Sequence, residues 1–510
     1  MKTNIARPRS FVLAAATLFS ALGWGQGLQN SGLQYLQNIS IPGWKTTGAT
    51  GNANVDLMGF NPVTHMMYLA DRTNNGIDVI DTRTNVVVGL IKMPSGSPPQ
   101  TPAVGPNAVL VAINLQQLIV TDGQQTVYVW DLRAPQAQPD VYTFPTSWGT
   151  DTDGAAYDPI NQTVYIVTDN PPEYLVGINL AYKKIVNSTP LPVSSDLIAF
   201  NPTDGKIYIS AEDADPGPPN TNANAGVWAY DPTSGNPGTV TQVVKVGPAC
   251  PGHGIDIDPV SNIAGVGCFG GTGDTGDIVV NLSTGKLVQT LTDIGGTDAV
   301  VFNPNNRRFY FAAGLNAATT SGCPSGPKGP FGAFTPIVGV VTQSGGSVVP
   351  NANCTGGGHI VGVDPLTNFV YVPVSQYPAD PNSGTTGVNG VLVFKDSTPP
   401  AQSPVTQASA SLTGIGGSAG GTVQFTLNGR RMHLTSGPMG LPTSATAAWI
   451  TVPTTVTNEL LPCAVNTSNQ TAVCGEDLLG DPLIGATVTL SADSGSGGVA
   501  VARGAITRIQ

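Results

Sequence analysis

Six positions in the chain carry a carboxylate or an imidazole at one repeated spacing. Each stands five residues before an Asn-Pro or Asp-Pro pair, and they are Asp56, Asp153, Asp196, His253, Asp298 and His359. Carboxylates gathered at one place favour hard cations such as Ca²⁺ or Mg²⁺, and imidazole extends the choice to zinc. We therefore expect a ring of these side chains, with Asp196, His253, Asp298 and His359 as candidate ligands of a divalent cation.

Two interpretations of these positions stay open. In the structural one, an Asp or His at the start of a strand accepts hydrogen bonds from the backbone of a neighbouring loop, once in every copy. In the functional one, Asp56, Asp153, Asp196 and Asp298 face a bound ligand. If the protein is an enzyme, His253 and His359 are the candidate general bases of a hydrolytic or lyase reaction.

The same spacing identifies an internal repeat. A tyrosine stands seven residues after the Asn or Asp in five of the six copies, namely Tyr68, Tyr165, Tyr208, Tyr310 and Tyr371. A seventh copy, which lacks the Asn/Asp-Pro turn, fits residues 104–133. Short β-branched and aromatic runs between turns predict four strands per copy, and the copy length suits a propeller blade.

The two ends of the repeat region predict how the ring closes. Ser-Thr-Pro-Pro follows the third strand of the last copy, so no fourth strand is expected there. Residues 33–43, before the first copy, look like the fourth strands of the other copies. We expect this N-terminal segment to complete the last blade and leave no open edge.

The Asn/Asp-Pro turns and tyrosine strands, such as Tyr165-Ile-Val-Thr-Asp-Asn, resemble the YVTN-type seven-bladed β-propellers of secreted and surface proteins in bacteria and archaea. The resemblance covers about residues 33–396 and implies an all-β propeller. Lactonase-type and streptogramin-lyase-type propellers share the phrase His-x-x-x-apolar-Asp-Pro and are distantly similar. The complete active-site pattern of neither is found here, and a fold alone does not assign a function.

The N-terminus and the cysteines predict an exported protein. Residues 1–25 combine a basic start, an apolar run and small residues, which is the layout of a signal peptide. The apolar run is shorter than the roughly 20 residues of a spanning helix, so no membrane span is expected. Six cysteines pair most simply as neighbours, giving Cys250–Cys268, Cys323–Cys354 and Cys463–Cys474. Zinc ligation by thiolates is the weaker alternative, because no C-x-x-C occurs.

Composition excludes several other classes. The 510 residues include 63 Gly and 43 Pro, only 10% are charged, and the net charge is −11. So many helix breakers exclude a long helical bundle, and the acidic excess argues against nucleic acid as a partner. A hydrophobic share of 40% argues against a disordered chain.

The remaining sequence predicts a linker at 397–412 and a small, sandwich-like β domain at 413–510. Long loops after the second strand of several copies predict a binding face on the side of the ring. The expected function is a secreted, monomeric binding or scaffold protein that presents this face to a small molecule, a glycan or a protein. The alternative is a metal- or His-dependent enzyme of lactonase or lyase type at the channel mouth.

Overall fold

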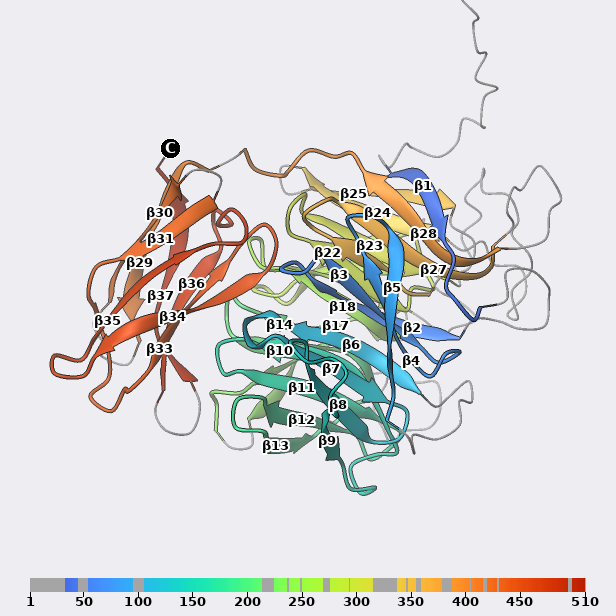
Figure 1. Ribbon diagram of the computed structural model, residues 1–510, viewed down its shortest axis with the longest axis horizontal. Coiled ribbons are helices and arrows are strands. Elements are labelled where there is room, and N and C mark those ends of the chain that lie inside the picture. The colour runs from blue at the N-terminus through green and yellow to red at the C-terminus, as the bar shows by residue number, and fades with distance from the viewer. Residues whose placement is uncertain are drawn as a thin grey trace, which may run out of the picture.

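Four-stranded antiparallel sheets recur seven times in the computed structural model (Figure 1). The structure describes residues 33–44, 54–94, 105–212, 224–235, 238–247, 250–268, 276–292, 294–314, 337–344, 347–354, 359–377, 388–403, 405–415, 420–428, 431–493 and 498–509. The predicted signal peptide and the long loops after the second strands of the fourth, sixth and seventh copies lie mostly outside these residues.

Each blade contributes one strand to each of four shells. The inner strands are β2 (Val55–Asn61), β6 (Pro106–Ala112), β10 (Asp151–Asp158), β14 (Ser195–Asn201), β18 (Gly252–Asp258), β22 (Ala299–Asn303) and β26 (Gly362–Asp364). The second strands are β3 (Met66–Asp71), β7 (Gln117–Asp122), β11 (Thr163–Asp169), β15 (Lys206–Ala211), β19 (Ile263–Cys268), β23 (Arg308–Ala313) and β27 (Phe369–Tyr377). The third strands are β4 (Gly76–Asp81), β8 (Thr126–Asp131), β12 (Tyr174–Asn179), β16 (Gly226–Asp231), β20 (Asp277–Asn281), β24 (Ile337–Ser344) and β28 (Val388–Asp396). The outer strands are β5 (Val86–Lys92), β9 (Asp140–Thr143), β13 (Lys184–Pro190), β17 (Thr239–Lys245), β21 (Lys286–Leu291), β25 (Ser347–Cys354) and β1 (Leu33–Ile39).

The inner strands surround a central axis. Each one contacts the inner strand of the next blade, and β26 of the last blade contacts β2 of the first. The predicted closure is confirmed, because β1 pairs antiparallel with β28 and supplies the outer strand of the last blade. The predicted seven-bladed all-β propeller is therefore the fold of this chain.

The repeated Asn/Asp-Pro pairs form the turn after each inner strand. In all six, the side-chain oxygen of the Asn or Asp accepts the backbone N–H two residues later, as Asn61 does from Val63 at 3.0 Å and Asp158 from Ile160 at 2.8 Å. All six side chains are buried. Such an Asx turn explains the repeated residue type, since a short side chain satisfies backbone donors that the turn leaves unpaired.

The second blade, whose copy lacks the Asn/Asp-Pro pair, forms the turn after its inner strand without an Asx turn. Ala112 and Ile113 stand where the other blades have Asn/Asp and Pro, and a short 3-10 helix, η1 (Ile113–Leu115), connects β6 to β7. Gln116 then takes a left-handed backbone (φ 52°), as His65, Gln162 and other residues do at the matching place in their blades. The backbone path is thus preserved although the motif is lost.

The C-terminal residues form a separate barrel-like sheet, drawn in orange and red in Figure 1. Its strands are β29 (Gln407–Gly414), β30 (Gly421–Asn428), β31 (Arg431–Ser436), β32 (Met439–Gly440), β33 (Ala448–Pro453), β34 (Asn458–Asn466), β35 (Thr471–Asp477), β36 (Thr487–Asp493) and β37 (Gly498–Arg508). Pairing of β31 with β35 closes this sheet on itself. Because β29 begins at Gln407, the connection to the propeller is shorter than the linker expected at 397–412.

Two of the predicted disulfides are present. Cys250 is bonded to Cys268 in the fifth blade, and Cys463 to Cys474 across the directly opposed strands β34 and β35. The side chains of the third pair, Cys323 and Cys354, lie outside the described residues. Two disulfides fit an oxidising compartment. The described residues contain no helix long and apolar enough to cross a membrane.

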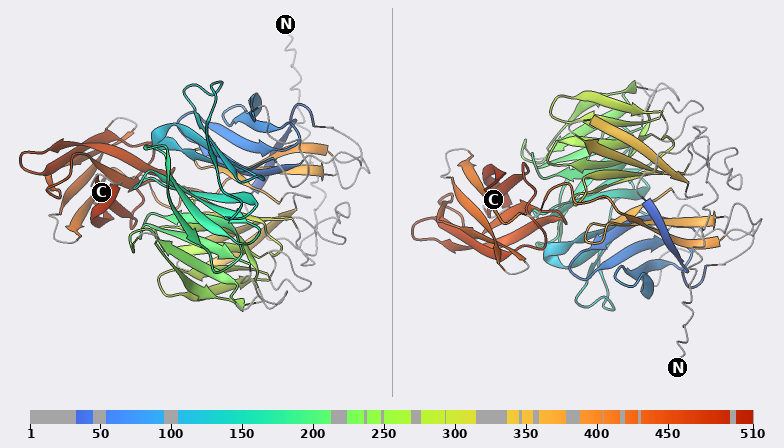
Figure 2. Two further views of the ribbon diagram at one scale, coloured as in Figure 1. Left: turned by 90° about the horizontal axis from the view of Figure 1, so that it is seen from below. Right: turned by 90° about the horizontal axis from the view of Figure 1, so that it is seen from above.

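The C-terminal domain rests on the face of the propeller that carries the Asx turns (Figure 2). Arg503 donates to the backbone carbonyl of Asp204 in the turn of the fourth blade at 3.2 Å. The amide of Ala401 donates to the carbonyl of Asn305 in the turn of the sixth blade at 2.9 Å. These contacts leave the opposite face, where the inner strands begin, on the far side from the domain.

The motif tyrosines anchor blades through buried hydroxyls, and one of them offers a test of the fold. Tyr310 donates to Asp396, the last residue of β28, at 2.6 Å, and Arg308 pairs with the same carboxylate at 2.9 Å. We expect Tyr310→Phe to lower the free energy of unfolding by about 2 kcal/mol, because a buried carboxylate loses a donor. Urea denaturation measures the change, and Tyr35→Phe on exposed β1 is the control expected to stay within about 0.5 kcal/mol of wild type. Equal stability of Tyr310→Phe and wild type would contradict this role.

Candidate functional site

The predicted ring residues stand at an irregularity at the start of the inner strands. In five blades the pairing of the inner with the second strand shifts register just there, for example between Val55 and Met58 and between Gly252 and Ile255. A bulge of this kind bends the strand and redirects a side chain. It occurs at the same place in successive blades, so it places the chemically active side chains around one mouth of the channel.

Glycine allows two of these strand starts to approach their neighbours closely. A Cβ on Gly154, next to Asp153, would lie 2.4 Å from the carbonyl oxygen of Asp196. A Cβ on Gly254, next to His253, would lie 2.5 Å from the carbonyl oxygen of Asp298. Either contact is too short for a real side chain, so glycine at these positions permits the tight ring.

The structure adds a seventh member to the ring. In the second blade Pro106 pairs with Asp122 just as Val55 pairs with Asp71 in the first, so Asn107 is the counterpart of Asp56. Its amide donates to Asp151 at 3.2 Å and to the carbonyl of Thr152 at 2.9 Å. The sequence contains a signal for Asn107. Ile119 occupies the place of the motif tyrosine in the second blade, and Asn107 precedes Ile119 by the same spacing by which Asp56 precedes Tyr68.

His253 of the fifth blade is held by three carboxylates from the two neighbouring blades, Asp196 and Glu212 of the fourth and Asp298 of the sixth. Its Nδ1 lies 3.1 Å from Asp196 Oδ2 and 3.7 Å from Asp298 Oδ1, and its Nε2 lies 2.7 Å from Glu212 Oε1. One ligand atom each of Asp196, His253 and Asp298 fall within 4.8 Å of one another. His359 Nε2 lies 4.0 Å from Asp298 Oδ2, on the other side of that carboxylate.

The protonation of this cluster follows from its charges. Burial acts to lower the pKa of His253, but the charge and hydrogen bond of Asp196, with Asp298 and Glu212, raise that pKa well above its ordinary value. Burial acts to raise the pKa of Asp298, yet the His253 hydrogen bond and the charges of His359 and His253 hold it below its usual range. Without a metal, His253 is therefore an imidazolium between carboxylates at neutral pH.

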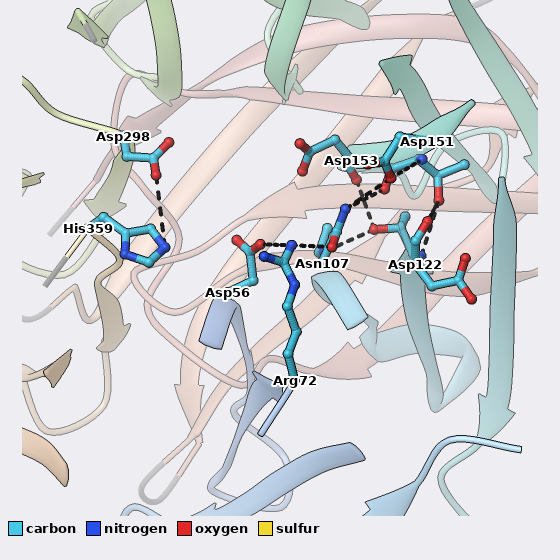
Figure 3. A network of polar contacts seen from close by, with 11 residues as sticks. Asp56, Arg72, Asn107, Asp122, Asp151, Asp153, Asp298 and His359 are labelled. Carbon is cyan, nitrogen blue, oxygen red and sulfur yellow. Dashed lines mark hydrogen bonds and ion pairs between the residues drawn. The ribbon is translucent and has the colours of Figure 1, made fainter. Parts of the chain in front are cut away.

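In the other half of the ring, formed by Asp56, Asn107 and Asp153 of the first three blades, the cation is the guanidinium of Arg72 (Figure 3). Arg72 bridges Asp56 and Asn107, and its side chain is only 13% exposed. Burial nevertheless raises the pKa of Asp56 to about 6, against the lowering charge of Arg72. Burial raises the pKa of Asp151 to about 7, and burial with the charges of Asp196 and Asp56 raises that of Asp153 far above its ordinary value. This half holds more carboxyl groups than its guanidinium neutralises.

Arg72 and Glu212 were missed by the sequence interpretation, although they share a position. Each directly follows the second strand of its blade and stands four residues after the motif tyrosine, Tyr68 or Tyr208. The repeat could have singled out this position. What the repeat could not show is that the loop after the second strand bends its first side chain toward the ring.

The six predicted ring residues are brought to one mouth of the channel. The hydrogen bonds and ion pairs described for their side chains run to other side chains, as in the Asp196–His253–Asp298 and Asp56–Arg72–Asn107 groups. His433 lies far away in the C-terminal domain, where it pairs with Asp477 at 2.8 Å.

Next to the ring, among the inner strands, lies a cavity of about 310 Å³. All seven blades contribute to its wall, and Leu57, Ala108, Leu197 and Ala299 follow ring residues directly. Thr457 and Asn458 of the C-terminal domain line its opposite end. The site thus combines a charged mouth with an interior that apolar side chains and polar groups, among them Asn114 and Asp256, line together.

Comparisons with known proteins assign neither a family nor a function to this chain. No family model matches the chain, and no curated protein matches it. Many solved chains match in structure; one belongs to "Crystal Structure of Mitotic Checkpoint Complex", with a TM-score of 0.46 and 11% identity, covering 78% of this chain and 99% of that chain.

Removing the guanidinium of Arg72 tests how much its ion pair with Asp56 contributes to the stability of the fold. We expect Arg72→Met to lower the free energy of unfolding by about 3 kcal/mol, because it leaves the largely buried carboxylate of Asp56 without its partner. Adding Asp56→Asn to Arg72→Met removes that unpaired charge and is expected to restore part of the stability. Urea denaturation of the two variants and the Asp56→Asn single variant completes the cycle. Additive effects of the two substitutions would show that the pair is not coupled.

Proposed function

We propose that this chain is a binding protein whose ligand site is the acidic mouth of the propeller channel. A propeller fits a binding or scaffold role. Among the described residues, the charged ring is where carboxylate and imidazole groups gather most closely. The observation that carries the proposal is the convergence of Asp196, His253 and Asp298 within 4.8 Å. A divalent cation held there by these residues, with His359 nearby, is the first ligand that this geometry suits.

The surroundings of His253 support metal binding. Glu212 accepts from one ring nitrogen, while the other faces the two aspartates. Metal-binding histidines usually donate their free N–H to a carboxylate in this way, which fixes the tautomer and the ring orientation. With imidazole in the ligand set, zinc fits better than calcium or magnesium, which prefer oxygen ligands alone.

An enzyme of lactonase or lyase type receives less support. Such a reaction would use His253 or His359 as a general base. In the metal-free protein Asp196, Asp298 and Glu212 raise the pKa of His253 well above its ordinary value, which disfavours the neutral imidazole that a general base requires. The half-exposed His359 remains the candidate base for that alternative.

We also propose that the protein is secreted, acts as a monomer and belongs among the YVTN-type propellers. The propeller fold, the two disulfides and the apolar N-terminal run support this assignment. The partner would be a small molecule, a glycan or a protein that reaches the ring face, where the second strands β3 and β15 end.

Metal analysis of the purified mature protein tests the site. We expect about one zinc ion per chain by inductively coupled plasma mass spectrometry, and its loss in Asp196→Asn and His253→Ala. Glu212→Gln is expected to weaken zinc binding about 10- to 100-fold by calorimetry, because it orients the ligand without being one. Replacing His359 by alanine should have a smaller effect than replacing His253.

His433→Ala is the matched control, because it removes a histidine paired with an aspartate outside the ring. This variant should bind metal as wild type does. A wild-type protein that retains no divalent metal, and binds none when it is added, would overturn the metal site. Equal binding by wild type and His253→Ala would overturn the assignment of its ligands.

A further inference from the structure

The strand start that carries His253 has little backbone stiffness of its own. His253 stands between Gly252 and Gly254, in the stretch of β18 where the pairing with β19 shifts register. Glycine restricts the backbone less than any other residue, so this stretch alone leaves the imidazole many positions. A histidine that reaches three carboxylates of two neighbouring blades therefore needs a constraint from outside its own strand.

The Cys250–Cys268 disulfide supplies such a constraint. Cys250 lies three residues before His253, and Cys268 is the last residue of β19, where it pairs directly with Gly252. The bond holds the two Cα atoms 4.8 Å apart, and both cysteines are buried. It thus joins the two strands covalently at the place where the bulge interrupts their pairing.

Cys268 is also connected to the aspartate of the sixth blade. Its amide donates to Asp277 at 2.9 Å, and the hydroxyl of Thr297 donates to the same carboxylate. Its carbonyl accepts the amide of Gly296 at 3.1 Å. Gly296 and Thr297 immediately precede Asp298 in the chain. The end of β19 therefore fixes the approach to two ring positions, one through the disulfide and one through these hydrogen bonds.

Two other blades tie the start of the inner strand with hydrogen bonds instead. In the fourth blade the amide of Ser195, at the start of β14, donates to Glu173 at 2.8 Å. In the first blade the amide of Asn54, just before β2, donates to Thr73 at 2.7 Å. The tie in the fifth blade differs from these two because thiol–disulfide exchange can release it.

We propose that the Cys250–Cys268 disulfide positions His253 and Asp298 for a divalent cation, so that metal affinity depends on the redox state of this bond. The inference rests on the proposed metal site and adds its regulation. Reduction by a dithiol transfers two electrons and two protons to the bond, which leaves thiols at Cys250 and Cys268 and a disulfide in the reductant. The strand start then regains the freedom that its glycines permit, and the close approach of the ligand atoms is lost.

Thermodynamic reciprocity gives this coupling a second consequence. If the disulfide strengthens metal binding by some factor, bound metal stabilises the disulfide against reduction by the same factor. A tenfold coupling makes the reduction potential of the bond about 30 mV more negative. The coupling can therefore be measured from the metal side and from the disulfide side.

Zinc calorimetry on the full-length protein tests the positioning role. The double variant Cys250→Ala/Cys268→Ala has neither the bond nor its thiols. We expect it to bind zinc about tenfold more weakly than wild type, which is the size of effect that loss of an orienting partner has at metal sites. The absorption spectrum of Co²⁺ bound in place of zinc should also change, because it reports the ligand geometry, which a loss of stability alone does not alter.

The disulfide of the C-terminal domain offers the matched control. Cys463→Ala/Cys474→Ala removes a bond between two strands that lie outside the propeller. This variant should match wild type in zinc affinity and in the Co²⁺ spectrum. Circular dichroism shows whether each variant is folded.

Redox titration of the wild-type protein measures the same coupling without a variant, which covers a double variant that does not fold. Dithiothreitol buffers set the potential, and a metal buffer holds free zinc above the dissociation constants of both redox states. Alkylation and peptide mass spectrometry follow the Cys250–Cys268 bond. Its reduction should need a potential about 30 mV more negative with zinc than without it, whereas the Cys463–Cys474 bond should not shift.

The outcomes separate this inference from the proposed function. Equal zinc affinity of wild type and the folded double variant, or a potential that zinc does not shift, would overturn the positioning role and leave the metal site standing. Tighter zinc binding by the reduced protein would also overturn it, because the thiolates would then act as ligands. A wild-type protein that binds no divalent metal would overturn both proposals.

Discussion

The antiparallel pairing of β1 with β28 is the interaction on which the rest of the structure depends. It joins the first described strand to the last strand of the propeller, so the seventh blade is built from both ends of the repeat region. Closure leaves no free sheet edge and fixes the number of blades around the axis. Only in a closed ring do the starts of β2 and β26 become neighbours, which brings His359 to the same mouth as Asp56.

Burying several carboxylates at the charged mouth is energetically unfavourable, and the fold offsets this with nearby cations. Buried carboxylates raise one another's pKa, and each half of the ring compensates with one cation, Arg72 in one half and His253 in the other. Arg72 and Glu212 occupy equivalent places after β3 and β15, yet one supplies a positive and the other a negative charge. The repeat therefore provides equivalent backbone positions, and individual substitutions make the two halves chemically different.

The C-terminal domain has a place in this arrangement that its own sequence does not reveal. It sits on the Asx-turn face, where Arg503 bonds to the turn at Asp204, and two of its residues line the channel. The propeller thus has two unlike faces, a charged one where its inner strands begin and one covered by a second domain.

The sequence by itself determined the repeat, because each blade must satisfy the same turn and bury the same tyrosine, and both needs leave residues at fixed spacing. It identified the six ring positions and two of the described disulfides for the same local reason. It could not identify Asn107 by motif, because η1 replaces the turn that marks the other copies. The tertiary structure alone decided that Glu212 and Asp298 hold His253 from either side, since these residues come from different blades and meet only when consecutive blades pack against each other. It also decided the contact of Thr457 and Asn458 with the channel, which depends on how two folded domains pack.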